Sequence, residues 1–117
     1  MIQRIGNSHR WSDVVISSGT AYWVEVAADM TQDVRGQISQ VLAQIDETLA
    51  QIGSDRHQMI QILVYLADLQ NMPILNELWD AWVPAGSAPV RACVGVQLGH
   101  GCEVEMVITA HLESSEG

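Results

Sequence analysis

The 117-residue sequence contains no lysine, and five arginines are its only strongly basic side chains. Aspartate and glutamate number 14, which leaves a formal net charge of -9 at pH 7. Proteins that bind nucleic acids usually gather lysine and arginine on one surface, where these side chains displace counterions from the phosphate backbone. The charge therefore argues against a nucleic-acid partner.

Long apolar runs are also missing, since no stretch approaches the roughly 20 apolar residues that cross a bilayer. Residues 1–10 lack the apolar segment and small-residue cleavage site of a secretory signal. We therefore expect a soluble, cytoplasmic protein with no membrane partner. The two cysteines, Cys93 and Cys102, form neither a CxxC pair nor a Cys/His cluster with zinc spacing. Reduced thiols are expected, with no metal or other cofactor.

Chain length predicts one domain over residues 1–117, with a flexible tail at 113–117. Residues 12–17 and 20–27 are rich in β-branched and aromatic side chains, and the turn-forming pair Ser18-Gly19 separates them. This pattern predicts a β-hairpin, to which a short strand at 2–5 could add.

A helix is predicted over residues 31–52, with Thr31 as its cap and Gly53 as its left-handed end. Apolar side chains recur there every three or four residues and share one face: Val34, Ile38, Val41, Ile45, Leu49 and Ile52. Residues 59–67 are almost entirely apolar, which is typical of a central strand covered on both faces.

A second helix is predicted from Asn71, which could cap it, to the break at Pro84. Two more strands are expected over 90–98 and 102–112, joined by a glycine-rich turn at 99–101. The order ββαβαββ predicts a mixed sheet with both helices on one face. Because no further segment could cover the other face, we expect self-association.

The segment PVRACVGV at 89–96, followed by Val104-Glu105-Met106, resembles the pattern P-x-R-x-x-V-x-V…V/I-E-I/M of the reactive intermediate deaminase (RidA/YjgF) superfamily, also labelled endoribonuclease L-PSP. Trp11-Ser12 stands where that family usually carries a tyrosine and a serine. The combination of WSDVVI, WDAW and APVR resembles a shorter, YoaB-like branch. The resemblance implies an α+β, chorismate-mutase-like homotrimer in which three sheets form a barrel, with clefts between subunits.

In members of this family the motif arginine binds the carboxylate of a 2-imino acid, and water attacks the imine carbon to release ammonia and a 2-oxo acid. Arg91 is the matching residue, and a planar guanidinium suits a carboxylate because it donates two parallel hydrogen bonds. An ordinary salt bridge to a neighbouring acid is the alternative role for Arg91.

Glu105 is the only ionisable residue within 104–110, so it is the candidate to position or deprotonate the water. Its alternative is a solvated strand carboxylate. Cys93 would contribute its backbone rather than its thiol, because attack by water needs no covalent intermediate. Trp11 would form an apolar wall of the substrate site or pack at an interface.

Two departures from the family pattern bear on activity. Val24-Glu25-Val26 replaces the usual S-G-Q, and the interval from Arg91 to Glu105 is one residue shorter than is typical. A three-residue loop at 99–101 would pair Cys93 with Glu105 and place Arg91 on that same face, whereas an even loop would need a bulge to do so.

The resemblance favours an enzyme that hydrolyses reactive 2-imino or enamine acids, with Arg91 binding the carboxylate and Glu105 acting on the water. The alternative is a non-catalytic trimer that binds small carboxylates such as 2-oxo acids. A ribonuclease, which the second family label suggests, is disfavoured by the acidic surface and by the absence of a basic patch.

Overall fold

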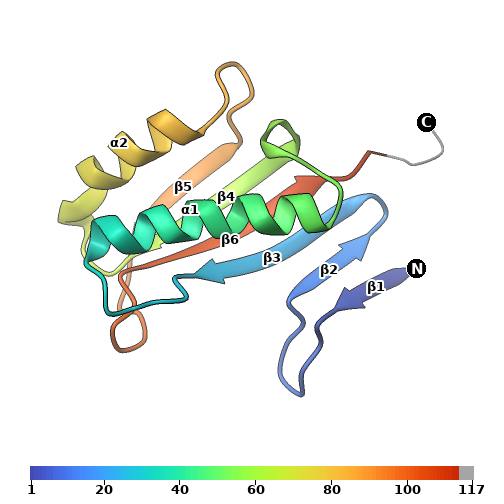
Figure 1. Cartoon of the computed structure of the whole chain (residues 1–117), viewed down its shortest axis with the longest axis horizontal. Helices are drawn as coiled ribbons and strands as arrows, with labels where there is room; N and C mark the ends of the chain where they lie inside the picture. Colours follow the sequence, from blue (N-terminus) through green and yellow to red (C-terminus); the bar gives the residue numbers. More distant parts are fainter. Residues whose placement is uncertain (114–117) are drawn as a thin grey trace.

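The computed structural model describes residues 1–113, so most of the expected tail, 114–117, lies outside the described residues. Within that range the chain forms one six-stranded sheet and two α-helices (Figure 1). The elements in chain order are β1 Ile2–Ile5, β2 Val14–Ser17, β3 Thr20–Val26, α1 Val34–Gln51, β4 Met59–Leu66, α2 Met72–Trp82, β5 Val90–Gly95 and β6 Val104–His111. The predicted α+β class, the element order and the short first strand are confirmed.

In the described part of the chain, the strands lie in the order β1-β2-β3-β6-β4-β5, and only the β4–β5 pair is parallel. Both helices cover the same face of the sheet, as predicted (Figure 1). Side chains of alternate strand residues point to that face and form the core with the helices, among them Trp23, Ile62, Val64, Met106 and Ile108. In the described part of the chain, neither helix is long and apolar enough to span a membrane.

The β2–β3 hairpin forms at the predicted pair. Ser18 and Gly19 both have positive φ angles, 52° and 76°. Two consecutive residues with positive φ match a type I′ turn, whose twist follows that of the strands.

Helix α1 begins later than predicted, because Asp33 rather than Thr31 is its N-cap. The Asp33 carboxylate accepts a hydrogen bond from the Gly36 N–H, and Thr31 instead donates its hydroxyl to Asp29. The end at Gly53 is confirmed, with a φ of 77°. In α2, Asn71 holds the N-cap position but makes no side-chain cap bond.

The prediction that β5 and β6 form a hairpin is wrong. Strand β4 lies between them, parallel to β5 and antiparallel to β6. Residues 96–103 therefore carry the chain past the end of β4 rather than closing a three-residue turn. The two strands are also shorter than predicted, at Val90–Gly95 and Val104–His111.

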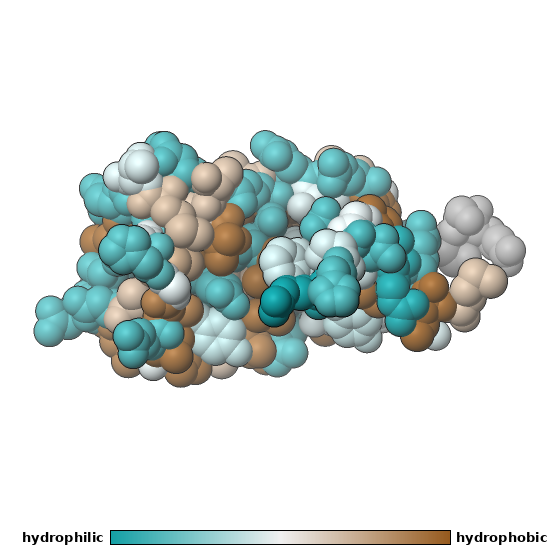
Figure 2. All heavy atoms as spheres, turned by 90° about the horizontal axis from the view of Figure 1, so that it is seen from below, coloured by the Kyte–Doolittle hydropathy of each residue, from teal (hydrophilic) through white to brown (hydrophobic). Residues whose placement is uncertain are grey.

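No helix of the described chain covers the second face of the sheet, although β4 was expected to be buried on both faces. Leu63 and Tyr65 of β4 are half-buried there, and several apolar side chains elsewhere are exposed: Tyr22, Val24, Val90 and Val94. Seen from below (Figure 2), hydrophobic side chains show between hydrophilic ones at the surface.

Three glutamines of α1 hold the neighbouring loops by bonds to backbone groups. Gln37, which is 1% exposed, donates to the carbonyls of Met30, Gln32 and Gly101 and accepts from the Glu103 N–H. Gln40 bonds the backbone of Asp29, and Gln44 bonds that of Val26 and Ala28. The spacing places all three on the side of α1 that faces these loops.

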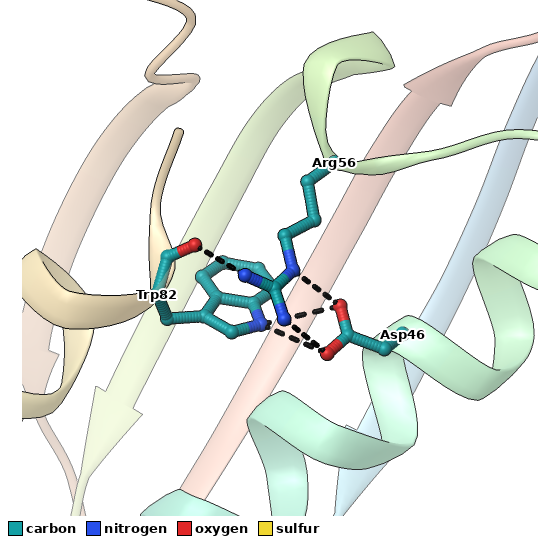
Figure 3. Close-up of polar contacts among 3 residues, drawn as sticks. All are labelled: Asp46, Arg56 and Trp82. Atoms are coloured by element: carbon teal, nitrogen blue, oxygen red, sulfur yellow. Dashed lines mark hydrogen bonds and ion pairs between the residues drawn. The ribbon is translucent and has the colours of Figure 1, made fainter. Parts of the chain in front are cut away.

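A second polar anchor joins the two helices to the segment before β4 (Figure 3). Arg56 donates two hydrogen bonds of 2.8 Å to the carboxylate of Asp46 on α1, and a third to the Trp82 carbonyl at the end of α2. The Trp82 indole N–H also points to Asp46, at 3.2 Å from its Oδ1. This anchor fixes the end of α2 against α1.

Candidate functional site

Arg91 lies on edge strand β5 and points to the helix-covered side of the sheet. Its Nη2 donates to Asn76 Oδ1 at 2.8 Å, and its guanidinium carbon lies 5.1 Å from the centroid of the Trp79 ring. Both partners belong to α2, and neither carries a charge. The guanidinium therefore keeps several N–H groups for a ligand.

Two other arginines are paired with carboxylates. Arg35 pairs with Glu77 at 2.6 Å and Arg56 pairs with Asp46 at 2.8 Å. Across residues 1–113, no carboxylate lies within 4.0 Å of the Arg91 guanidinium. The salt-bridge alternative for Arg91 thus finds no partner among the described residues.

Cys93 shares the face of Arg91, because both residues lie two apart on β5 and pair with the inward-facing Ile62 and Val64. The thiol packs against the core, and its burial raises its pKa, while the nearby Arg91 acts in the opposite direction. A raised pKa leaves less thiolate, the nucleophilic form. The environment therefore does not activate this thiol.

Glu105 projects from the opposite face. Its register partners are Val26 on β3 and Tyr65 on β4, both on the side that the helices leave uncovered. Within one chain, Arg91 and Glu105 thus stand on different faces, and the expectation that a short loop would bring them to one face is wrong. The physical reason is that β4 lies between β5 and β6. Because these two strands do not pair directly, the number of residues in the loop that connects them does not decide which of their side chains share a face.

A cavity of about 930 Å³ wraps around the end of β3. It exists because β2 begins at Val14, opposite Trp23, so that residues 24–26 have a pairing strand only on the β6 side. We call it the β3 cavity. Its lining comprises Ile5, Trp11, Ser12, Asp13, Val14, Tyr22, Trp23, Val24, Glu25, Val26, Thr48, Gln51, Glu105 and Val107.

The β3 cavity brings together two of the predicted site residues, Trp11 and Glu105, but Arg91 and Cys93 do not line it. Trp11 is 65% exposed, so much of its surface is accessible to a ligand or a partner. Its backbone is held by the Ser8 hydroxyl, which contacts both the N–H and the carbonyl of Trp11.

Glu25 is a site residue that the sequence reasoning noted only as a departure. Burial raises its pKa to about 7, the Thr48 hydroxyl opposes this, and the carboxylates of Glu47 and Asp13 add to it. Within residues 1–113, Glu25 Oε2 has no hydrogen-bond partner, and neither does Nε1 of the neighbouring Trp23. The alternation of side chains along a strand could have identified Glu25, because this residue follows Ala21 and Trp23 at intervals of two and so lies on the same core-facing side.

The described residues include no group of three or more His, Cys, Asp or Glu side chains arranged to hold a metal ion. Among the described residues, the cavity lining carries three carboxyl groups, from Asp13, Glu25 and Glu105, and no arginine. A ligand with a carboxylate would therefore need a cation from outside this cavity.

Comparison with known proteins shows what this arrangement resembles. The profile of the family described as endoribonuclease L-PSP matches residues 1–112. The RutC family protein YoaB of Escherichia coli strain K12 is 42% identical over 93 residues, which cover 80% of this chain and 82% of that protein. A RutC family protein of Haemophilus ducreyi is 38% identical over 112 residues, covering 94% and 96%.

Solved structures agree with the sequence matches. The crystal structure of a YjgF family member from Neisseria meningitidis superposes with a TM-score of 0.91 at 35% identity, covering 98% of both chains. The YoaB-like resemblance read from the sequence is confirmed by these relatives. The chain belongs to the endoribonuclease L-PSP family within the RidA/YjgF superfamily.

Proposed function

We propose that this protein hydrolyses reactive 2-imino or enamine acids to 2-oxo acids and ammonia, at sites that form between the subunits of a homotrimer. Arg91 binds the substrate carboxylate, and Glu105 positions the attacking water. Membership of the RidA/YjgF superfamily supports a function of this general type.

The observation that supports the proposal most directly is the set of contacts that the Arg91 guanidinium makes. The chain is strongly acidic, yet within the described residues Arg91 is held by a neutral amide and a ring face rather than by a carboxylate. Asn76 and Trp79 restrict the orientation of the guanidinium without neutralising its charge. A preoriented, uncompensated guanidinium is suited to binding a carboxylate with two hydrogen bonds.

The two faces of the sheet explain why a second copy is needed. Arg91 lies on edge strand β5 on one face, and Glu105 lies in the β3 cavity on the other. One small substrate could reach both only if Arg91 of one copy approaches the cavity of another. The uncovered apolar side chains of the sheet favour such an assembly, because water leaves their surface on association.

Hydrolysis of the imine needs a carboxylate that accepts a proton from water rather than a side chain that attacks the substrate. Water adds through its oxygen to the imine carbon, Glu105 accepts a proton from that water, and the carbon–nitrogen double bond becomes single. The nitrogen takes up that proton from Glu105 and then the proton of the new hydroxyl, so that the carbon–nitrogen bond breaks as the carbon–oxygen double bond forms, which releases ammonia and leaves the 2-oxo acid.

The experiment follows the decay of enzymatically generated iminopyruvate or iminobutyrate in the presence of purified protein. We expect faster decay with wild type and a loss of about 100-fold or more for Arg91→Ala, since the clamp both binds and orients the substrate. Arg35→Ala is the matched control, because it removes an exposed, paired guanidinium. Unchanged decay with wild type, or equal rates for Arg91→Ala and wild type, would refute the proposal.

The alternative is a trimer that binds 2-oxo acids through Arg91 without turnover. Calorimetry would then show binding that Arg91→Ala weakens, while imine decay stays at background. The departure at Val24-Glu25-Val26 is the feature that favours this alternative. A ribonuclease activity has less support, because a net charge of -9 repels an RNA backbone.

A further inference from the structure

The β3 cavity has a part that the proposed chemistry does not use. It lies on the helix-covered side of β3, where Trp23 and Glu25 meet Thr48 and Gln51 of α1. Trp23 is 5% exposed, and its Nε1 finds no acceptor within the described range of residues 1–113. Glu25 Oε2 is likewise buried without a donor in that range. Two residues of one cavity wall thus carry a buried donor and a buried carboxyl oxygen that have no partner among residues 1–113.

The spacing of these two groups suits one ligand group. Trp23 and Glu25 are two residues apart on β3, so their side chains leave the same face about 7 Å apart along the strand. The pairing of β3 with β2 ends at Trp23, opposite Val14, so that Glu25 has no β2 residue beside it among residues 1–113. A ligand that offers an acceptor to the indole N–H and a donor to the carboxyl would satisfy both.

The charges around Glu25 indicate an uncharged ligand group rather than a cation. At neutral pH the carboxyl is only partly ionised, because burial raises its pKa to about 7. The acidic neighbours are Asp13 before β2, Glu47 on α1 and Glu105 on the other face of β6, whereas Thr48 and Gln51 are neutral. Asp13 and Glu47 are exposed, so water and salt screen their attraction for a cation. A cation would also leave the Trp23 N–H unpaired.

We infer that Trp23 and Glu25 form a subsite for an uncharged polar group with one acceptor and one donor, of which a primary carboxamide is the simplest. The carboxamide oxygen accepts from Trp23 Nε1, and its N–H donates to Glu25 Oε2. The ligand class is then a 2-imino or 2-oxo acid whose side chain ends in such a group. Only the acid end of this ligand rests on the proposed function.

The test compares 2-oxo acids of one shape. The 2-oxo acid derived from asparagine ends in a carboxamide, and the one derived from leucine has methyl groups in the same places. Calorimetry gives the ratio of their affinities, and the indole N–H signal of Trp23, assigned with Trp23→Phe, reports contact at the subsite. We expect the carboxamide to bind at least about tenfold more tightly, because a site built around a hydrogen bond discriminates against an analogue that lacks it.

Variants separate hydrogen bonding from charge. Glu25→Leu removes the carboxyl and should bring the affinity ratio close to one, and Trp23→Phe should lower it about threefold or more. Glu25→Gln retains a donor and an acceptor and should keep the ratio within about threefold of wild type. Glu47→Gln removes a neighbouring charge outside the cavity and is the matched control, with the ratio unchanged.

Three results would overturn the subsite. The first is equal binding of the two acids. The second is loss of the preference in Glu25→Gln together with tighter binding of the arginine-derived 2-oxo acid. The third is that no probe binds at millimolar concentration. The Arg91→Ala variant separates this inference from the proposed function. If that variant keeps both the affinities and the preference, the carboxylate clamp fails while the subsite stands.

Discussion

Arg91 and Glu105 lie on opposite faces of one sheet, on strands β5 and β6 that are separated by β4. Arg91 contacts α2, whereas Glu105 opens into the β3 cavity on the far side of the sheet. Side chains of one rigid sheet do not change faces. A site that uses both residues therefore has to draw them from different copies of the chain.

Subunit mixing tests this arrangement. Arg91→Ala and Glu105→Gln should each be inactive in imine hydrolysis, but an equimolar mixture of the two should regain about a quarter of wild-type activity after full subunit exchange, because one site in four then receives both intact residues. Activity is measured after subunit exchange, which native mass spectrometry verifies. Each variant exchanged with itself is the control. A persistent lack of activity in verified mixed trimers would show that both residues act within one chain, or not at all.

The folded-state pKa of Glu25 predicts a pH-dependent stability. The folded chain binds the Glu25 proton more tightly than the unfolded chain, so the free energy of unfolding should fall as pH rises from about 4.5 to about 7. Glu25→Gln cannot ionise and should be more stable than wild type at pH 8 by about 1 kcal/mol, because water screens the partly exposed carboxylate and limits the cost of its burial.

Urea unfolding of both proteins at pH 5 and pH 8 measures this difference. Asp80→Asn, which removes an exposed carboxylate on α2, is the control and should show no comparable change between the two pH values. If the stability gain of Glu25→Gln is the same at both pH values, ionisation of Glu25 does not cause it.

Gln37 should be the most sensitive polar position of α1. Gln37→Leu leaves the Glu103 N–H and three backbone carbonyls without their partner, which should cost about 2–3 kcal/mol. Gln40→Leu is the matched control: its site is less buried, so water can replace the lost bonds and the cost should stay below about 1 kcal/mol. Equal losses in chemical denaturation would contradict this role for burial.

Arg56 should not be replaceable by lysine. Arg56→Lys keeps the charge but loses the paired hydrogen bonds to Asp46 and the bond to the Trp82 carbonyl, which should lower stability by about 1 kcal/mol. Because Arg56 also lies 5.3 Å from the Trp82 ring centroid, tryptophan emission should change. Arg35→Lys, at the exposed pair with Glu77, should change stability less than Arg56→Lys does. Similar losses in both variants would argue against the anchor.

Local patterns in the sequence were sufficient for the elements of the fold. Apolar spacing of three and four residues identified α1, because a helix buries one stripe. The pair Ser18-Gly19 identified the first hairpin, because a type I′ turn needs two residues that tolerate positive φ. The motif around Arg91 identified the family, and the relatives confirmed it.

Local sequence patterns could not predict which distant segments pair in the sheet. The alternation of β5 and β6 is compatible with a hairpin, and only the packing of the whole sheet places β4 between them. The same limit applies to the cap of α1, where Thr31 and Asp33 are both suitable residues and the path of the chain selects Asp33.

By itself the sequence determined the acidic charge, the family, the order of the elements and the guanidinium of Arg91. These depend on residue identity and on contacts between near neighbours in the chain. Only the tertiary structure decided that Arg91 meets no carboxylate among residues 1–113, that it faces away from Glu105, and that Trp23 and Glu25 share a cavity wall. The physical reason is that face, burial and partner depend on which strands lie side by side, and the sheet arranges strands far apart in sequence.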